Sequence, residues 1–316
     1  MEEQTIAGAG GFETVGGIAD DGGGAARSGV VPEGGLGAGA LPVRMVRGGP
    51  KFTSFVALGD SFTEGMVDKR PDGSMRGWAD LVAERLSRFD PAFRYANLAV
   101  RGRLVRQISD DQVPAALRMG ADLVSLATGL NDVARPGCDL EAICDQLERC
   151  AATLVEAGAT VVMFQSVDFT YRMPSLRRFV PRVQRLIDKV EGLRERYGVV
   201  VVDLSIERIF DDPRMWAPDR VHLATEGHRR IAEAVLEALG CEPAYDWRAP
   251  LPARRKPWVI VRMYANVIWT VRFLAPWIRR RMTGRSSGDG REAKRPELRP
   301  VDEGGGWAGQ QQGRTA

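Results

Sequence analysis

Histidine and cysteine are scarce in this sequence, which limits the metal and redox chemistry that it can carry. The 316 residues include two histidines, His222 and His228, and no H-E-x-x-H pair. We therefore expect neither a metal site nor a cofactor. The four cysteines form no C-x-x-C pair, so the sequence predicts reduced thiols in a cytoplasmic protein.

An excess of one charge is also lacking. The chain has 44 Lys and Arg residues against 41 Asp and Glu residues, and the formal net charge of +3 is too small to indicate a nucleic acid partner. The amino-terminal residues contain no basic segment followed by an apolar run. No signal peptide is therefore expected.

The first fifty residues have little with which to build a core. Residues 1–50 hold 15 of the 36 glycines. Such a stretch buries too little apolar surface to offset the entropy lost on ordering, so we expect it to be disordered. Met45 is an alternative start of translation, and a chain that begins there leaves the prediction of a cytoplasmic protein unchanged.

What the sequence does contain is a regular alternation of short apolar runs and helical patterns. Five βα units at this spacing predict an α/β protein, a three-layer α/β/α sandwich around a five-stranded parallel sheet. In such sheets the ligand site lies beyond the carboxyl ends of the strands. The strands are predicted at 52–58, 93–98, 123–127, 160–165 and 199–204, and the helices at 77–89, 104–119, 140–157, within 174–197 and at 225–239.

Chemistry-bearing residues fall at the ends of these elements. A Gly-Asp-Ser-Phe-Thr-Glu-Gly segment places Ser61 where the first strand ends and a helix should begin. A helix N-terminus offers unpaired N–H groups and a partial positive charge, which suit a serine alkoxide and the oxyanion that it creates. Gly102 and Asn131 follow the second and third strands, and His222 precedes the last helix, three residues after Asp219.

In this order the segments resemble the SGNH hydrolases, the GDSL-type esterases and lipases, over about residues 52–239. The resemblance implies the flavodoxin-like SGNH hydrolase fold, with Ser61 as the nucleophile and His222 as its base. Histidine suits that role because its pKa lies near neutrality. Asp219 would accept a hydrogen bond from the second ring nitrogen and fix the tautomer. His228 falls inside the first turns of the last helix and is interpreted as a structural residue.

The same resemblance assigns three donors to an oxyanion hole. They are the backbone N–H groups of Ser61 and Gly102 and the side-chain amide of Asn131. A glycine at position 102 lets the substrate approach the backbone closely. Taken alone, Gly102 is also compatible with a simple turn and Asn131 with an Asx-turn. Leu130 stands where many family members carry a polar or small residue, which affects local pocket shape alone.

A second serine motif is interpreted differently. Residues 284–288 match the G-x-S-x-G spelling of a nucleophile elbow, but they lie in a stretch rich in Gly, Ser and Arg. The elbow requires a preceding strand and a following helix, so this match is predicted to be linker. We expect a catalytic domain over 51–242, a helical extension over 243–282 and a disordered tail over 283–316.

The extension is basic and rich in tryptophan. Between Asp246 and Asp289 there is no acidic residue, while ten Arg and Lys residues and four Trp residues occur. A helix is predicted over 257–282, but the longest uncharged run, 263–271, is far shorter than the roughly 20 residues that span a bilayer. Two interpretations remain open. The helix docks its apolar face on the catalytic domain near the mouth of the site, or it lies on an anionic membrane surface.

We therefore expect a metal-independent serine hydrolase that cleaves a small-molecule or lipid-like carboxylic ester through an acyl-enzyme. Three alternatives remain: an acyltransferase, a carbohydrate deacetylase that uses the same site, and an inactive membrane-peripheral protein that acts through its carboxyl-terminal helix. No nucleic acid partner is expected. Peripheral contact with an anionic membrane through 257–282 remains among the expectations.

Overall fold

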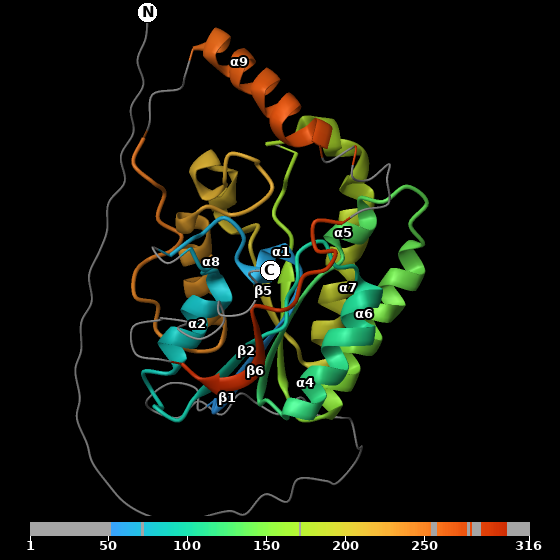
Figure 1. The fold of residues 1–316 in the computed structure, drawn as a ribbon, viewed down its shortest axis with the longest axis vertical. Coiled ribbons are helices and arrows are strands. Elements are labelled where there is room, and N and C mark those ends of the chain that lie inside the picture. Colours follow the sequence, from blue (N-terminus) through green and yellow to red (C-terminus); the bar gives the residue numbers. More distant parts are fainter. Residues whose placement is uncertain are drawn as a thin grey trace, which may run out of the picture. The chain divides into compact units, whose positions relative to one another are not determined.

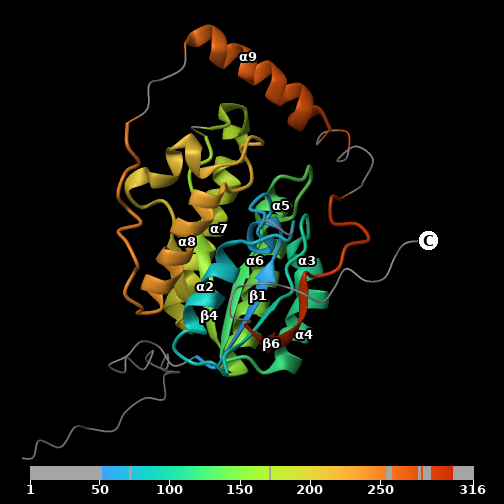
Figure 2. The ribbon, with the colours of Figure 1, turned by 60° about the vertical axis from the view of Figure 1, so that its left-hand side comes forward.

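The computed structural model describes residues 52–70, 73–170, 172–253, 258–276, 279 and 286–301. All of them belong to one compact unit, Ala40–Ala316. The segment 1–50, predicted to be disordered, lies outside the described residues. Figures 1 and 2 show a central sheet covered by helices, with the parallel strands ending toward the top of both views.

A mainly parallel sheet forms the centre of this unit, as the sequence predicted. Neighbouring strands follow the order β5-β4-β3-β1-β2-β6, and β1 pairs in parallel with both β2 and β3. All six residues of β1 are buried, which is typical of a strand with helices on both faces. The strands are β1 (Ser54–Gly59), β2 (Arg94–Asn97), β3 (Leu123–Ala127), β4 (Thr160–Gln165), β5 (Val200–Asp203) and β6 (Arg295–Pro300).

The sixth strand corrects the expectation of five. β6 pairs antiparallel with β2, with Tyr95 opposite Arg299, so the prediction of a disordered tail is wrong for this part of 283–316. Its sequence, Arg-Pro-Glu-Leu-Arg-Pro, has no apolar alternation from which a strand could be predicted. Polar contacts hold it instead: the buried Arg295 donates from Nε to the carbonyl of Tyr95 at 2.6 Å. Prolines are tolerated here because β6 is an edge strand.

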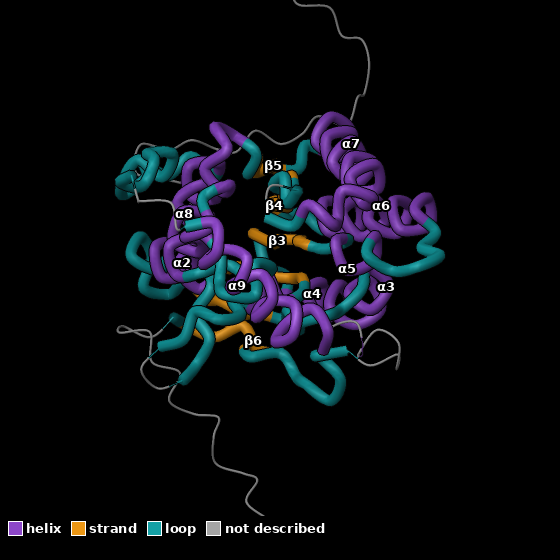
Figure 3. Tube along the Cα trace, turned by 90° about the horizontal axis from the view of Figure 1, so that it is seen from above, coloured by secondary structure: helices purple, strands orange, loops and turns teal. Residues whose placement is uncertain are grey.

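Helices cover both faces of the sheet (Figure 3). On one face α2 and α8 pack around Trp78, Val82 and Ile231, and on the other α4, α6 and α7 pack around Leu147 and Val190. The helices are α1 (Ser61–Glu64), α2 (Trp78–Leu86), α3 (Val105–Gln107), α4 (Val113–Met119), α5 (Leu130–Val133), α6 (Leu140–Glu156), α7 (Val180–Tyr197), α8 (Thr225–Ala238) and α9 (Val259–Trp269). Two π-helical turns, η1 (Ile108–Gln112) and η5 (Thr270–Leu274), and three 3₁₀ turns, η2 (Pro174–Phe179), η3 (Ile206–Asp211) and η4 (Pro213–Met215), complete them.

The helix predicted over 104–119 is interrupted by the π-helical turn η1. Pro114 stands in the first turn of α4 and has no N–H to donate to the preceding turn. Gln112, at the end of η1, reaches the end of β1 instead: its amide oxygen accepts from Gly59 N at 2.8 Å, and its amide nitrogen donates to Gly59 O at 3.0 Å. The irregular helix therefore fixes the strand end that leads into Ser61.

The carboxyl-terminal helix α9 continues into η5, and the two cross the end of the unit at which the parallel strands finish (Figures 1 and 2). Within the described ranges, no helix combines the length and the apolar character needed to cross a bilayer. The wall of the site described below includes residues from η5.

Candidate active site

A cavity of about 590 Å³ opens at the carboxyl end of the sheet. All five residues singled out from the sequence line it. They come from loops and short helices after β1, β2 and β3 and from the loop before α8: Ser61, Gly102, Asn131, Asp219 and His222. The structure therefore brings together residues that are up to 161 positions apart in the chain.

The turn from β1 into α1 places Ser61. Gly59 has φ of +149°, and a Cβ at this position would lie 2.5 Å from the carbonyl oxygen of Ala127 on the neighbouring strand, so only glycine fits. Asp60 caps α1 by accepting from Phe62 N at 3.1 Å. Burial raises the pKa of Asp60 to about 6, although the N–H of Phe62 opposes that rise. The turn is thus held by a buried carboxyl group next to Ser61.

Gly102 lies in the loop after β2, which an ion pair positions. Arg101 N donates to Glu64 Oε2 at 2.7 Å, and the Arg101 guanidinium pairs with the same carboxylate. Gly102 has φ of +75°, in the left-handed region that favours glycine. A Cβ added here would meet the hydroxyl oxygen of Ser286 at 2.2 Å. The loop conformation therefore favours glycine, and a side chain here would also force the Ser286 hydroxyl to turn away.

That neighbour corrects the interpretation of the second serine motif as linker. The hydroxyl of Ser286 donates to the carbonyl of Gly102 at 3.4 Å, and Ser286 and Ser287 line the cavity. A Cβ at Gly288 would lie 2.0 Å from the carbonyl oxygen of Arg101, so the motif packs closely on this loop. Ser287–Gly290 form a turn, and among the described residues that follow it, 291–301, there is no helix of the kind that an elbow requires; residues 280–285, before Ser286, lie outside the described residues.

Asn131 stands on α5, directly after β3. Its amide nitrogen donates to Asp60 Oδ2 at 2.7 Å and to the carbonyl of Arg103 at 3.2 Å. The neighbouring Asp132 accepts from Val105 N at 3.1 Å. Asp60 and Asp132 therefore brace their loops through backbone amides, and Asn131 ties the β3 loop to the turn that carries the serine.

Asp219 and His222 face each other within one tight loop. Asp219 Oδ2 lies 2.6 Å from His222 Nδ1, and Asp219 Oδ1 accepts from the backbone N–H groups of Val221 and His222, both at 3.0 Å. Burial acts to raise the pKa of Asp219, but the hydrogen bonds and charge of His222 outweigh it, and the pKa lies below its usual value. Arg220, between them, adopts φ of +63°, which bends the loop back on itself.

Two residues at this loop could not be predicted from the sequence. Trp269, on α9, donates from its indole N–H to the carbonyl of Asp219 at 2.8 Å. Arg172 stacks on Trp216, with its guanidinium carbon 3.4 Å from the ring centroid, and donates from Nε to the carbonyl of Arg220 at 3.4 Å. Burial lowers the pKa of Arg172 to about 10. Neither contact has a local sequence signal, because its partners are about fifty residues away.

The rest of the cavity wall is mainly apolar, with a basic component. Side chains of η2 and α7 contribute Leu176, Phe179 and Leu186, and β4 contributes Met163 and Phe164. Three arginines also line the cavity: Arg135, Arg172 and Arg272. An apolar cavity of this size with a few polar groups is typical of a small-molecule site. Among the described residues, no group of three or more His, Cys, Asp or Glu side chains could hold a metal ion.

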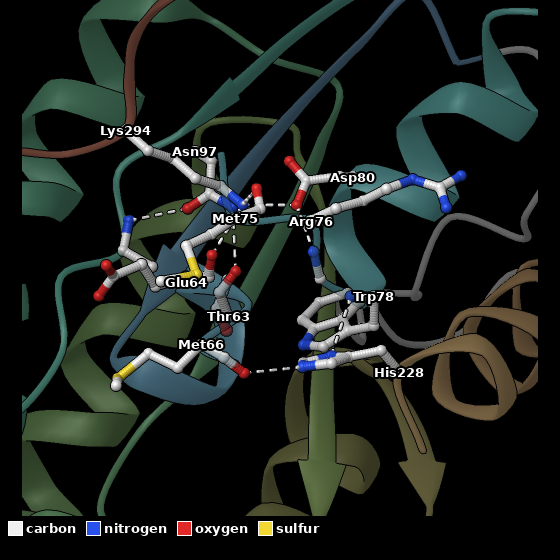
Figure 4. A network of polar contacts seen from close by, with 12 residues as sticks. Thr63, Glu64, Met66, Met75, Arg76, Trp78, Asp80, Asn97, His228 and Lys294 are labelled. Atoms are coloured by element: carbon white, nitrogen blue, oxygen red, sulfur yellow. Dashed lines mark hydrogen bonds and ion pairs between the residues drawn. The ribbon is translucent and has the colours of Figure 1, made fainter. Parts of the chain in front are cut away.

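His228 does not line this cavity. It is buried on α8, where Nδ1 accepts from Trp78 N at 3.2 Å and Nε2 lies 3.4 Å from the carbonyl of Met66 (Figure 4). Burial lowers the pKa of His228 to about 4, so the ring is neutral at physiological pH. His228 is thus a structural residue, as the sequence indicated.

The same network holds the carboxyl-terminal segment. Lys294 reaches the carboxyl end of α1, where its ammonium group lies 2.5 Å from Asp80 Oδ2 and donates to the carbonyl of Glu64 at 2.7 Å (Figure 4). The Asp80 side chain is fully buried and also accepts from Gly77 N at 2.7 Å. The segment before β6 is therefore part of the packed unit that supports Ser61.

Comparisons with known proteins identify the family and the fold. The sequence matches the GDSL-like Lipase/Acylhydrolase family over residues 57–230, more than half of the chain. The structure is similar to that of LAE5, an alpha/beta hydrolase enzyme from the metagenome of Lake Arreo, Spain, with 23% identity, a TM-score of 0.50 and coverage of 60% of this chain and 95% of that chain. A comparison with curated proteins found no match.

A second similar structure is a point mutant of Axe2, an acetyl-xylooligosaccharide esterase from Geobacillus Stearmophilus. The identity is 19%, the TM-score is 0.50, and the match covers 61% of this chain and 97% of that chain. At these identities the two structures establish the fold, whereas the family match establishes the relationship. The chain belongs to the GDSL-like Lipase/Acylhydrolase family and is a carboxylic ester hydrolase of the SGNH type.

Proposed function

We propose that Ser61 is the nucleophile of a two-step ester hydrolysis, with His222 as its base and Asp219 as the residue that orients His222. The observation that carries the proposal is the 2.6 Å contact between Asp219 and His222 in a cavity that Ser61 also lines. Because Asp219 binds Nδ1–H, Nε2 is left as the basic nitrogen. Ser61 and His222, both described, share no hydrogen bond in this structure, and such bonds often tighten only when substrate binds.

The two steps use these groups in turn. The Ser61 hydroxyl oxygen attacks the ester carbonyl carbon while His222 Nε2 takes its proton, and His222 then returns that proton to the departing alcohol as the carbon–oxygen bond breaks. In the second step His222 takes a proton from water, whose oxygen attacks the acyl carbon, and His222 returns that proton to the Ser61 oxygen as the acyl carbon–oxygen bond breaks and the carboxylic acid leaves. The lowered pKa of Asp219 keeps it ionised at neutral pH, where it stabilises the imidazolium.

The oxyanion would be stabilised by the backbone N–H groups of Ser61 and Gly102 and by the side-chain amide of Asn131. That amide has two hydrogens and already donates to Asp60 and to Arg103. We therefore expect one of these two bonds to shift toward the oxyanion when it forms. Loss of one such donor typically lowers the rate by about 100- to 1000-fold.

The shape of the cavity supports an acyl chain longer than acetyl. The apolar side chains of η2, α7 and β4 line the same cavity as Ser61, and an acetyl group alone would occupy a small part of its 590 Å³. A lipid-like ester therefore fits better than an acetylated carbohydrate. Transfer of the acyl group to an alcohol other than water would use the same residues, and the products distinguish it from hydrolysis.

The test compares hydrolysis of p-nitrophenyl acetate, butyrate and a longer-chain ester by the wild-type protein and by the Ser61→Ala and His222→Ala variants. Both variants should lose at least about 1000-fold in turnover. Ser286→Ala is the matched control, because it removes a serine hydroxyl that lines the same cavity. A fluorophosphonate should also label the wild-type protein on Ser61 and leave Ser61→Ala unlabelled.

Two results would contradict the assignment. Unchanged turnover in Ser61→Ala would show that another residue is the nucleophile. Equal losses of turnover in Ser61→Ala and Ser286→Ala would contradict a role that belongs to Ser61 and not to Ser286. A preference for acetate over the longer esters would overturn the proposed chain length and favour the carbohydrate deacetylase. Formation of a transesterification product in the presence of an added alcohol would identify the acyltransferase.

A further inference from the structure

Nine large apolar side chains are exposed along a single helical segment. Trp258 is 83% exposed, Ile260 76% and Tyr264 69%. An exposed apolar patch that is continuous along one element usually marks a surface that binds something. The nine residues are Trp258, Val259, Ile260, Val261, Met263, Tyr264, Val267, Ile268 and Val271.

Three of these exposed residues lie on the face of α9 opposite Trp269, which lines the cavity. Ile260, Tyr264 and Val267 are spaced at i, i+4 and i+7, so they form one stripe along the helix. At about 100° per residue, Trp269 lies roughly half a turn away from that stripe. Trp269 is the residue that contacts the Asp219 carbonyl. Docking of α9 on the catalytic unit therefore leaves the stripe uncovered.

The described contacts that hold α9 to the rest of the unit come from its carboxyl-terminal half. Arg220 donates to Asn266 Oδ1 at 2.6 Å and lies 4.9 Å above the ring of Trp269. Beyond them, Arg272 and Phe273 of η5 form part of the cavity wall. The helix is thus attached beside the cavity wall, and its amino-terminal end stands apart from the other helices (Figure 2).

The charges that flank the patch in the sequence have one sign. No acidic residue occurs between Asp246 and Asp289, and three basic residues flank the patch on each side, at 254–256 and 279–281. Cations beside an apolar helix face favour an anionic lipid surface. Tryptophan and tyrosine, with an apolar ring and a polar atom, are suited to the same boundary. A second copy of the chain docked through this face would bring like charges together.

We propose that the outer face of α9 and η5, defined by Ile260, Tyr264, Val267 and Val271, binds the surface of an anionic lipid bilayer together with the exposed Trp258 at the amino-terminal cap of α9. The helix would lie in the plane of the interface, with the flanking cations on the lipid head groups. Because η5 lines the cavity, this binding places the cavity mouth at the bilayer, where an ester of a membrane amphiphile can enter. Entry of such an ester rests on the proposed function, whereas membrane binding does not.

The experiment is co-sedimentation of the full chain with vesicles of phosphatidylcholine alone and with vesicles that contain about one third phosphatidylglycerol. We expect binding to the anionic vesicles and a loss of that binding as NaCl rises from about 0.05 to 0.5 M. Replacement of Ile260 and Val267 together by Glu should weaken binding at least about tenfold, because two buried apolar contacts are lost. Trp258→Phe should remove most of the blue shift in fluorescence on binding.

A matched control is Phe89→Glu. Phe89 is also a large apolar residue, 52% exposed, but it follows α2 and lies at the opposite end of the sheet. Its replacement should leave vesicle binding unchanged. The melting temperatures of both variants report whether the chain still folds, and neither Ile260 nor Val267 lines the cavity.

Three results would overturn the proposal. They are a wild-type chain that stays in the supernatant with both kinds of vesicle, equal binding by the wild type and the double variant, and a double variant that converts a dimer into a monomer while vesicle binding is absent. The last result would identify a second copy as the occupant. Ser61→Ala should sediment like the wild type. The vesicle test therefore gives a clear result for membrane binding even if Ser61 is not the nucleophile.

Discussion

The indole N–H of Trp269 donates to the backbone carbonyl of Asp219 at 2.8 Å. One helix of the carboxyl-terminal extension therefore holds the loop in which Asp219 contacts His222. Arg220, between those two residues, has a positive φ and is itself bound by Asn266 of the same helix. The extension thus acts on the proposed base through the backbone of its loop.

Trp269→Phe tests this relationship, because it removes the N–H and keeps an aromatic ring. We expect kcat to fall by about three- to tenfold, the effect of one lost hydrogen bond on the positioning of the loop. Steady-state kinetics with p-nitrophenyl butyrate measure it. Trp258→Phe makes the same chemical change at an exposed residue outside the cavity and should leave kcat unchanged. Equal kinetics in the two variants would show that the contact does not matter for turnover.

Gly102→Ala should lower kcat/KM by about 100-fold, because the new methyl group displaces the loop that carries a proposed oxyanion donor. The added Cβ would meet the Ser286 hydroxyl at 2.2 Å, and φ of +75° disfavours any side chain. Adding Ser286→Ala to this variant removes the steric contact and leaves the backbone strain, so the double variant should recover only part of the activity. Full recovery of activity would assign the whole loss in kcat/KM to the contact with Ser286. No recovery would assign the whole loss to the strained backbone.

Asp60 should give stability an unusual dependence on pH. Its folded pKa of about 6 lies above the ordinary value of 3.8, so the folded protein takes up a proton between these values that the unfolded chain does not. The contribution of Asp60 to the free energy of unfolding is therefore largest below about pH 4 and falls as pH rises toward 6, by on the order of 3 kcal/mol.

Urea unfolding of the wild type and of Asp60→Asn at several pH values between 4 and 7 measures this contribution. The stability of the wild type relative to Asp60→Asn should rise as the pH falls, because asparagine takes up no proton. The oxygen of asparagine can still accept from Phe62 N, so the cap of α1 is kept. A constant difference between the two proteins across this range would contradict the raised pKa.

Lys294→Met should destabilise the fold by about 3–5 kcal/mol, because it leaves the carboxylate of Asp80 buried without its cation. Chemical denaturation measures the loss. A second replacement, Asp80→Asn, removes the stranded charge and should restore part of the stability in the double variant. If the single variant is as stable as the wild type, the segment before β6 is not held as the structure indicates.

Much of the fold could be predicted because its central strands are short, continuous apolar runs. β1 and β3 are buried at every position, and each is followed by a residue of the proposed site, Ser61 or Asn131. Parallel strands place their carboxyl ends at one edge, so those positions predicted one site. Where a site residue directly follows a strand, the local sequence pattern and the strand order are enough to predict its place in the site.

The features that escaped prediction depend on contacts between distant residues. β6 has a single large apolar residue, Leu298, and is positioned by Lys294 and Arg295, whose partners lie about two hundred residues earlier. Ser286 and its partner Gly102 are 184 residues apart. A Gly- and Ser-rich stretch offers no periodic pattern, so its place in the cavity wall appears only when the chain is folded.

The antiparallel pairing of β6 with β2 also limits how far this chain can be truncated. The family match ends at residue 230, and a chain shortened near that boundary would keep every proposed catalytic residue. It would nevertheless lose the strand that covers β2, and an uncovered edge strand invites pairing between molecules. It would also lose Trp269 and Ser286 from the cavity wall. A minimal domain drawn from homology alone is therefore expected to aggregate and to accept bulkier esters than the whole chain does.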